Sequence, residues 1–292
     1  MTEAAQAMRG TGAMAAAPER VAVIMRSKNE QPHTRRALDG LNRQRWRDFT
    51  LYNVDSGSTD GTLEVVREFN PARLTCIRPE EYVPGQVLNR MIAATPAPLL
   101  VLLNADAVPL DEFWLERLLA PIQAGAADAT MSWQGPRADA RFIVAYDYAR
   151  AYDPRHLTGD NADFFSAVAC AFRRELWEKT PFAASGYAED LGWARACRQQ
   201  GARFQLVSAS RVEHSHNYSL AELYRKKFRH GQAYVHIFGE RPALFRQAGR
   251  CLRELGRDLL YALRCGRPGT IPYNVAYRLV IHWALYRGRC RG

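Results

Sequence analysis

The 292-residue sequence contains no uninterrupted apolar run of the roughly 18–20 residues that a membrane-spanning helix requires. We therefore do not expect an integral membrane protein, although a protein that lies on a membrane surface remains compatible with the sequence. Zinc-ribbon and redox CxxC motifs are also absent, because no two of the six cysteines are two or three residues apart. Scattered thiols of this kind are typical of a cytoplasmic protein with reduced cysteines.

The N-terminal segment lacks the leucine-rich stretch of a secretory signal. Residues 1–19 are rich in Ala, Gly and Met, and Arg9 and Gly10 interrupt them. We predict a flexible tail at this end of the chain.

Positive charge is concentrated in one part of the chain. The formal net charge is +10, yet residues 203–292 hold 17 Lys and Arg against 5 Asp and Glu, whereas residues 1–202 hold 23 against 25. Any function has to account for a nearly neutral body followed by a strongly basic C-terminal third.

Short apolar runs alternate with helical patterns in the first half of the chain. Strands are predicted at residues 21–25, 51–54, 73–77 and 98–103, and helices at 34–45, 63–69 and 85–94. This alternation is typical of a parallel sheet covered by helices, so we expect an α/β fold.

The second half of the chain is less regular. We predict a helix at 112–124, a buried strand at 164–172, a helix at 190–200 closed by Gly201, a strand at 204–207, a His-rich connection at 212–219, and only helices from residue 220 onward.

Polar segments follow several of these strands, and ligands of open α/β sheets bind outside the carboxyl ends of the strands. The segments are 55–62, 104–106 and 213–216, and Glu189-Asp190 at the start of a helix forms a fourth. Each has a simple local explanation as a turn, a helix cap or a partner of the helix dipole. Their joint occurrence predicts a functional site.

The order and spacing of these segments resemble a glycosyltransferase of family 2 over residues 20–234. The motifs that carry the resemblance are Val23–Glu30 with its Asn-Glu ending, Val54–Thr62, Leu102–Pro109, Tyr187–Leu191 and Val212–His214. Pro84–Arg90 and His216–Leu220 look most like the rhamnosyltransferase-like branch of that family.

This resemblance implies a GT-A fold with a mostly parallel central sheet over residues 20–218 and a basic helical extension over 219–292. It also implies an inverting transfer from a nucleotide-sugar donor, dTDP-rhamnose or a UDP-sugar, to a hydroxyl of a glycan or lipid-linked acceptor. Surface polysaccharide biosynthesis is the expected setting.

The resemblance further assigns roles to individual residues. Asp190 is the expected catalytic base, with Glu189 orienting it or the acceptor. Asp106 and His214 are the expected ligands of Mn²⁺ or Mg²⁺, because Asn stands at position 104 where a full DxD motif has a carboxylate. Donor binding is assigned to Asn29, Glu30, Asp55, Ser56, Gly57, Asn89, Asn104 and Asp106. His216 could support the metal ligands as a neighbouring partner, but a hydrogen-bonding loop residue is the preferred expectation.

The basic C-terminal third allows three interpretations. Apolar residues recur on one helix face at Leu244, Ala248, Cys251, Leu255, Leu259 and Leu263, with arginines on the other faces. The arginines could form a solvated face, dock on an anionic membrane, or bind nucleic acid. No nucleic-acid motif accompanies them, so nucleic acid is not expected. A cytoplasmic protein, peripheral on the inner face of the cell membrane, fits the second interpretation.

Two other functions remain as alternatives. A sugar-1-phosphate nucleotidylyltransferase needs a Gly-rich, Arg-containing loop after its first strand, where this chain has Arg26–Glu30. A non-catalytic basic protein that binds membrane or nucleic acid would leave the joint placement of Asp55, Asp106, Asp190 and His214 unexplained.

Overall fold

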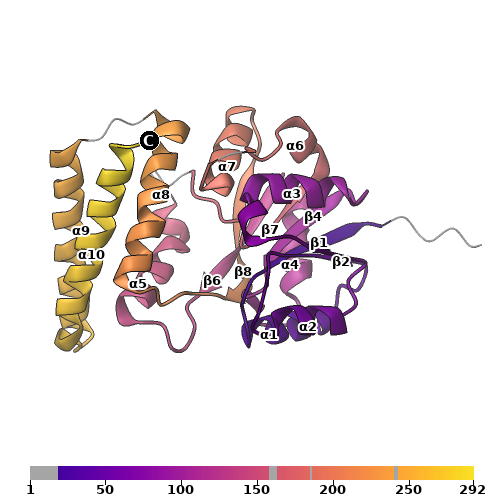
Figure 1. The fold of residues 1–292 in the computed structure, drawn as a ribbon, viewed down its shortest axis with the longest axis horizontal. Coiled ribbons are helices and arrows are strands. Elements are labelled where there is room, and N and C mark those ends of the chain that lie inside the picture. Colours follow the sequence, from indigo (N-terminus) through magenta and orange to yellow (C-terminus); the bar gives the residue numbers. More distant parts are fainter. Residues whose placement is uncertain (1–18, 158–162, 185, 240–242) are drawn as a thin grey trace, which may run out of the picture.

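The computed structural model describes residues 19–157, 163–184, 186–239 and 243–292 (Figure 1). Its centre is an eight-stranded mixed sheet with the strand order β3-β2-β1-β4-β7-β6-β8-β5. The strands are β1 (Val21–Ser27), β2 (Thr50–Asp55), β3 (Arg73–Cys76), β4 (Leu99–Asn104), β5 (Val108–Pro109), β6 (Ala129–Gly135), β7 (Ala169–Arg173) and β8 (Phe204–Glu213). Strands β1 to β4 are parallel, β7 is antiparallel to β4 and β6, and β8 is parallel to β6. The expected α/β fold with a mostly parallel sheet is confirmed.

Helices cover both faces of this sheet. They are α1 (His33–Asn42), α2 (Thr62–Glu68), α3 (Pro84–Ala93), α4 (Trp114–Gln123), α6 (Arg174–Lys179) and α7 (Glu189–Gln199). Helix α5 (Phe142–Ala151) packs instead against the helices at the C-terminal end of the chain. Successive residues of β1 point to opposite faces, so Ile24 packs with α3 and α7 while Val23 and Met25 pack with α1, α2 and α4. This two-sided burial explains why β1 reads as a continuous apolar run.

Two elements in the middle of the chain, β6 and α5, do not stand out in the sequence. Strand β6 is buried but carries polar residues, whose hydroxyls find internal partners: Thr130 bonds the Leu118 carbonyl, and Ser132 accepts from the Trp114 indole. Helix α5 is apolar and aromatic on most sides, so it lacks a clear helical period.

Two strand predictions have wrong boundaries. The strand predicted at 164–172 begins only at Ala169, and the described residues before it form turns and loop. Conversely, β8 extends to Glu213, beyond the predicted end at residue 207. Its pairing with β6 is irregular between Val207 and Arg211 and resumes after that point. The additional residues of β8 bring the chain to the edge of the sheet at which the polar segments lie.

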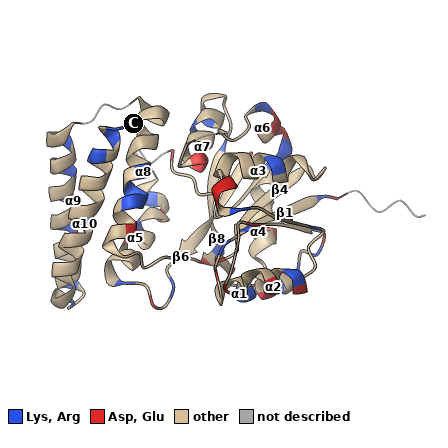
Figure 2. Cartoon of the chain, viewed as in Figure 1, with Lys and Arg blue, Asp and Glu red and all other residues tan. Residues whose placement is uncertain are grey.

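Three long helices follow the sheet domain and form a separate layer beside it (Figure 1). They are α8 (Leu220–Phe238), α9 (Leu244–Arg264) and α10 (Ile271–Arg289). Leu223 of α8 and Ile281 of α10 pack against Ile143 of α5 in a third apolar cluster. Arg278 of α10 pairs with Asp147 of α5 and Asp258 of α9, so a buried ionic group also joins this layer to the sheet domain. Lys and Arg recur along all three helices (Figure 2).

Among the described residues, no helix combines the length and the apolar character needed to cross a membrane. The predicted tail at 1–19 lies outside the described residues except for Glu19, whose carboxylate accepts hydrogen bonds from Tyr52 and Thr95.

Helices α8 and α10 approach each other closely through two glycines. A Cβ on Gly231 would lie 2.4 Å from the Leu285 carbonyl oxygen, and one on Gly288 would lie 2.1 Å from that of Phe228. Because these neighbours are backbone atoms, the helices would have to separate to admit a side chain.

We predict that Gly288→Ala destabilises the protein by about 1–3 kcal/mol, the usual cost of overpacking a well-packed contact. Gly249→Ala on α9 is the matched control, since a Cβ there meets nothing within 4 Å and alanine is favoured over glycine in a helix by about 0.5–1 kcal/mol. Urea unfolding measures both variants. Equal stability of the two would show that the α8–α10 contact is not tight.

Candidate active site

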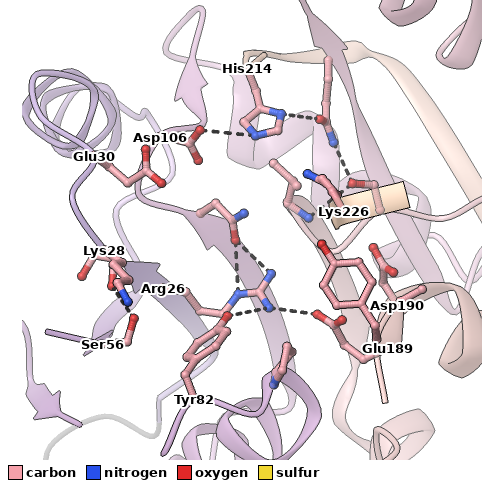
Figure 3. Close-up of a pocket in the computed structure, with 18 of the residues that line it drawn as sticks. Arg26, Lys28, Glu30, Ser56, Tyr82, Asp106, Glu189, Asp190, His214 and Lys226 are labelled. Atoms are coloured by element: carbon pink, nitrogen blue, oxygen red, sulfur yellow. Dashed lines mark hydrogen bonds and ion pairs between the residues drawn. The ribbon is translucent and has the colours of Figure 1, made fainter. Parts of the chain in front are cut away.

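A cavity of about 490 Å³ opens at the carboxyl ends of β1, β2 and β4 (Figure 3). The start of α7 and one side of α8 close it opposite the strands. Its wall includes the predicted residues Glu30, Ser56, Asn104, Asp106, Glu189, Asp190 and His214. The structure therefore brings most of the predicted site residues to one cavity, as the strand-end rule requires.

Asp55 shapes the loop after β2 and lies behind the cavity wall. One carboxylate oxygen accepts from the backbone N–H groups of Gly57 and Ser58 at 3.0 and 2.8 Å. The other accepts from the hydroxyls of Ser27 and Ser58 at 2.8 and 2.6 Å. Gly57 adopts φ +86°, which favours glycine in this turn. The buried carboxylate thus holds the turn that presents Ser56 to the cavity.

Asn29 joins the loops after β1 and β2. The side-chain oxygen of Asn29 accepts a hydrogen bond from the Thr59 backbone N–H at 2.7 Å, and the backbone N–H of Asn29 donates to the Ser58 hydroxyl at 3.0 Å. This pairing fixes the two loops together and places the neighbouring Glu30 at the wall of the cavity.

The structure places Asn89 away from the cavity wall. Its side-chain oxygen accepts from the Trp177 indole and the Phe182 backbone, and its amide donates to the Phe182 carbonyl. These contacts tie α3 to the segment after α6, which gives Asn89 a supporting position, and direct donor binding by Asn89 stays a prediction.

Asn104 belongs to a partly buried network centred on Arg26, whose ion pair with Glu189 is drawn in Figure 3. The Arg26 guanidinium donates to the Asn104 side-chain oxygen at 2.9 and 3.2 Å and forms an ion pair with Glu189 at 3.0 Å. Arg26 and Glu189 side chains are each only 11% exposed. Because one carboxylate already balances Arg26, the neutral amide at position 104 completes its hydrogen bonding without adding a second charge.

Three side chains converge beside Asn104 as a group that could hold a metal ion: Asp106, His214 and His216. Oδ2 of Asp106 lies 3.3 Å from Nε2 of His214 and 3.2 Å from Nε2 of His216. Two ligands that are each about 2.1 Å from an octahedral cation lie about 3 Å apart, so these separations suit a common ion. His216, expected to be a simple loop residue, is placed with the other two.

The surroundings of His214 leave a lone pair of its ring facing Asp106. Nδ1 lies 2.9 Å from Oε1 of Gln134, and the amide of Gln134 donates to Ser166, which orients that oxygen toward the ring. The Tyr148 hydroxyl lies 3.2 Å from the same Nδ1. In the tautomer in which Nδ1 donates to Gln134, Nε2 is an acceptor that faces the Asp106 carboxylate. Burial lowers the pKa of His214 to about 4, so the ring is neutral at pH 7. A cation between the two atoms resolves this opposition, and the residues fit Mn²⁺ or Mg²⁺.

Arg137 is a part of this group that sequence reasoning missed. Its guanidinium donates to Oδ2 of Asp106 at 2.9 Å and to the Asp106 carbonyl at 3.0 Å. Across the cavity, burial and the charge of Asp106 raise the pKa of Glu30. The region thus gathers two carboxylates around one guanidinium, which favours a further cation.

Asp190 lies at the other side of the cavity, where it is half-buried beside Glu189. Its two oxygens accept from the backbone N–H groups of Leu191 at 2.8 Å and Ala167 at 3.3 Å. Burial, followed by the charge of Glu189, raises the pKa of Asp190 to about 6. An oriented carboxylate with a raised pKa is suited to accept a proton near neutral pH.

The C-terminal helices also contribute to the cavity. Lys226 and His230 of α8 line it, and the Lys226 ammonium donates to the Tyr218 hydroxyl at 2.8 Å. In the sequence Lys226 is one of several neighbouring basic residues, and nothing distinguishes it from a solvated charge. Arg137 gives no sequence signal, whereas the HxH spacing of His214 and His216 is a mild one.

Comparison with known proteins assigns the class. Residues 22–180 match the sequence model of glycosyl transferase family 2. Because this match covers more than half of the chain, the protein belongs to that family. The assignment confirms the expected resemblance and argues against a nucleotidylyltransferase.

Two curated relatives are O-antigen chain rhamnosyltransferases. RfbN of Salmonella typhimurium is 25% identical over 207 residues, and WbaN of Salmonella anatum is 26% identical over 194 residues. The alignments cover 65% and 61% of this chain, and 65% and 60% of the respective relatives. The chain thus matches somewhat less than two thirds of each relative's length.

Solved structures confirm a GT-A-like fold. A mannosyltransferase from Pyrobaculum calidifontis, in complex with GDP-Man and Mn²⁺, superposes with a TM-score of 0.63 at 19% identity, covering 92% of this chain and 88% of its own. Glucosyl-3-phosphoglycerate synthase from Mycobacterium tuberculosis, in complex with Mn²⁺, UDP and phosphoglyceric acid, gives 0.56 at 20% identity, covering 75% and 79%.

We predict that His216→Ala weakens Mn²⁺ binding at least as much as Gln134→Ala, which removes the partner of His214 and costs about 10–100-fold. His236→Ala, an exposed histidine on α8, is the control and leaves affinity unchanged. Isothermal titration with Mn²⁺ measures all three. Wild-type affinity in His216→Ala would exclude His216 from the cation site.

Proposed function

We propose that this protein is an inverting glycosyltransferase that moves a sugar from a nucleotide-diphosphate donor to a hydroxyl group. One observation carries the proposal: a single cavity has Asp106 and His214, which form a group with His216, on one side and the half-buried carboxylate of Asp190 on the other. The bond from the sugar to the diphosphate could therefore break at the cation-binding side while the bond to the acceptor oxygen forms at the side of Asp190.

The nucleotide-sugar donor would bind at the side of the cavity that holds the cation-binding group. Asp106, His214 and His216 would hold Mn²⁺ or Mg²⁺, which neutralises charge that develops on the diphosphate leaving group. Lys226 reaches the cavity from α8 and supplies a further cation for the phosphates. Glu30 and Ser56, presented by the loops after β1 and β2, are placed to contact the nucleotide.

The sugar acceptor would bind at the opposite side of the cavity, where Asp190 takes up a proton from its hydroxyl group. As the acceptor hydroxyl attacks the anomeric carbon, its proton moves to the carboxylate, and the bond from that carbon to the diphosphate breaks on the opposite face. Two backbone hydrogen bonds keep the carboxylate in place. Glu189 is held by Arg26 and faces the same cavity, so it is positioned to orient the acceptor.

The rhamnosyltransferase relatives support a more specific proposal. We infer a rhamnosyl donor, dTDP-rhamnose, with UDP-sugars as the next candidates, and an acceptor glycan carried on a lipid. Surface polysaccharide synthesis at the cytoplasmic face of a membrane is the corresponding setting.

A donor screen tests the proposal. Thermal unfolding is measured with dTDP-rhamnose, UDP-sugars and GDP-mannose, each with Mn²⁺ and with excess chelator. We expect Mn²⁺-dependent stabilisation by one donor class, and loss of this effect in Asp106→Ala and His214→Ala. If no donor stabilises the protein, or if turnover is unaffected by chelator, the proposed cation-dependent chemistry fails.

Removing the proposed base should separate binding from catalysis. We predict that Asp190→Asn lowers kcat by about 10²–10⁴-fold, the usual contribution of general base catalysis, while donor affinity stays within a few fold. Asp48→Asn, an exposed site on the sheet domain, is the control. Retained turnover in Asp190→Asn would remove Asp190 as the base.

The pH dependence of turnover should report the same group. Because the base must be deprotonated and the pKa of Asp190 is raised to about 6, kcat should fall as the pH decreases through about 6. An ordinary aspartate would keep its activity down to about pH 4. A flat kcat between pH 7 and pH 5 contradicts the assignment.

Docking on a membrane is the second part of the proposal, supported by apolar side chains on the C-terminal helices. Large exposed apolar residues gather on α9 and α10, among them Phe245 (91% exposed), Leu252 (69%), Leu260 (55%), Leu263 (54%), Leu279 and Trp283. A neighbouring set of arginines on α9 complements an anionic surface.

We predict that the protein floats with vesicles containing phosphatidylglycerol and that Leu252→Ser with Leu263→Ser reduces the bound fraction several-fold. Leu110→Ser removes an equally exposed leucine from the sheet domain and should have no effect. Absence of binding to any vesicle, or an equal loss in both variants, counts against docking through α9.

A further inference from the structure

Arg137 lies beside the group to which the proposed function assigns a cation. It follows β6 in the chain, and one nitrogen of its guanidinium donates to Oδ2 of Asp106 at 2.9 Å and to the Asp106 carbonyl at 3.0 Å. The same carboxylate oxygen lies 3.3 Å from Nε2 of His214 and 3.2 Å from Nε2 of His216. A cation bound by this group would therefore share an oxygen with a guanidinium.

The position of Arg137 is fixed from two directions. Its backbone N–H donates to the Ser215 hydroxyl at 3.0 Å, and Ser215 stands between the two histidines of the group. The backbone N–H of His214 donates in turn to the Gly135 carbonyl at 2.8 Å, at the end of β6. The Arg137 side chain is only 12% exposed, so it has little room to turn from Asp106 into water. We therefore expect the guanidinium to stay beside Asp106 when a cation binds.

The charge of Arg137 opposes a cation on Asp106. A guanidinium stays protonated throughout the physiological pH range, so Arg137 cannot release its charge when a metal ion arrives. A unit charge within about 4–6 Å of a carboxyl changes the affinity of that carboxyl for a proton by about one to three pKa units. A metal ion on the same oxygen experiences the same repulsion, and its affinity is lowered accordingly.

The charge of Arg137 also reaches the wall of the cavity, where Glu30 lies. Burial and the charge of Asp106 raise the pKa of Glu30 to about 8, while the charge of Arg137 acts in the opposite direction. In addition, Nε of Arg137 is a buried donor that has no hydrogen-bond partner among the residues that the structure describes. Asp106 thus leaves part of the charge and donor capacity of the guanidinium unused, and both favour an anion nearby.

Lys226 of α8 is a second cation of this region, because it lines the same cavity as Asp106 and Glu30. These two carboxylates are therefore accompanied by two cations, Arg137 and Lys226. A divalent ion alone adds positive charge to a balanced group, whereas a divalent ion with a diphosphate brings negative charge along with it. The arrangement favours the pair over the ion alone.

We propose that Arg137 couples the cation to the nucleotide-sugar donor: its charge beside Asp106 weakens binding of the cation alone and strengthens binding of the diphosphate. The proposal rests on the cation site of the proposed function and deepens it. Arg137 is a positioning residue, since it acts through Asp106 and takes no part in bond formation. As a consequence, the protein holds the cation firmly only together with the nucleotide sugar.

The first measurement is the affinity for Mn²⁺ alone, by isothermal titration. Arg137→Gln removes the charge and keeps an amide that can donate to Asp106, whereas Arg137→Lys keeps the charge. Arg203→Gln is the matched control, because it removes one positive charge from an exposed arginine that pairs with Asp128 at the opposite end of β8. We expect Arg137→Gln to bind Mn²⁺ at least about tenfold more tightly than the wild type. Arg137→Lys and Arg203→Gln should stay within a few fold of the wild type.

The second measurement is the affinity for dTDP in excess chelator, which separates the diphosphate from the cation. We expect Arg137→Gln to bind dTDP several-fold more weakly than the wild type, because the variant lacks a charge that attracts the phosphates. The affinities for Mn²⁺ and for dTDP thus change in opposite directions. Damage to the structure of the site would weaken both, so the opposite signs distinguish the effect of charge from a structural role.

The proposal is overturned if Arg137→Gln binds Mn²⁺ no more tightly than the wild type, or if it binds dTDP as well as the wild type does. It is also overturned if Arg137→Lys behaves like Arg137→Gln, since charge would then not be the cause. Thermal unfolding checks that the variants fold, and Arg137→Met, which is neutral and unbranched, replaces Arg137→Gln if that variant does not.

Asp106→Ala separates this proposal from the proposed function. If Asp106→Ala loses the Mn²⁺ binding of the wild type while the Arg137 variants fail to behave as expected, the cation site stands and only the role of Arg137 falls. If the wild type and Arg137→Gln both bind no Mn²⁺, with or without dTDP, the cation site of the proposed function falls as well.

Discussion

One buried carboxylate oxygen sets the geometry of the donor end of this molecule. Oδ2 of Asp106 has Arg137 at 2.9 Å and the imidazoles of His214 and His216 at 3.3 and 3.2 Å. A buried carboxylate left without partners would cost several kcal/mol, so the ends of β4, β6 and β8 have to meet at this atom. The sheet order brings β8 next to β6 and thereby makes the meeting possible. The proposed cation binding would follow from these three ligands together rather than from any single motif.

The second constraint is charge balance around Arg26. Glu189 neutralises its guanidinium and Asn104 completes its hydrogen bonds, so the shortened DxD motif coexists with a fully partnered arginine. A carboxylate at position 104 would add an anion beside Glu189 and Asp190. Such an anion would raise the pKa of the proposed base further. The asparagine at position 104 is therefore consistent with an ionisable base near neutral pH.

The sequence predicts those parts of the fold whose burial is two-sided and local. The apolar run of β1 and the turn at Asp55 are read correctly, because the residue types within each short segment indicate them. The polar strand β6 and the aromatic helix α5 are missed, since their residues are satisfied only by distant neighbours such as Leu118 and Trp114. Arg137, His216 and Lys226 are missed as site residues for the same reason. The spacing of residues in the sequence indicates which residues follow the end of a strand. Which of these residues come into contact depends on packing between segments that are far apart in the sequence.

The structure shows that the basic residues of the C-terminal third lie in different surroundings. Lys226 lines the donor cavity, several arginines of α9 and α10 line a second cavity, Arg278 is buried in ion pairs, and others lie on α9 together with exposed apolar residues. The charge that looked like one property of the sequence thus lies in several different surroundings. Pulsed electron paramagnetic resonance of Mn²⁺ bound to the protein tests the proposed cation site at Asp106 most directly. The account predicts couplings from two imidazole nitrogens, one lost in His214→Ala and the other in His216→Ala. A bound Mn²⁺ without imidazole coupling would contradict it.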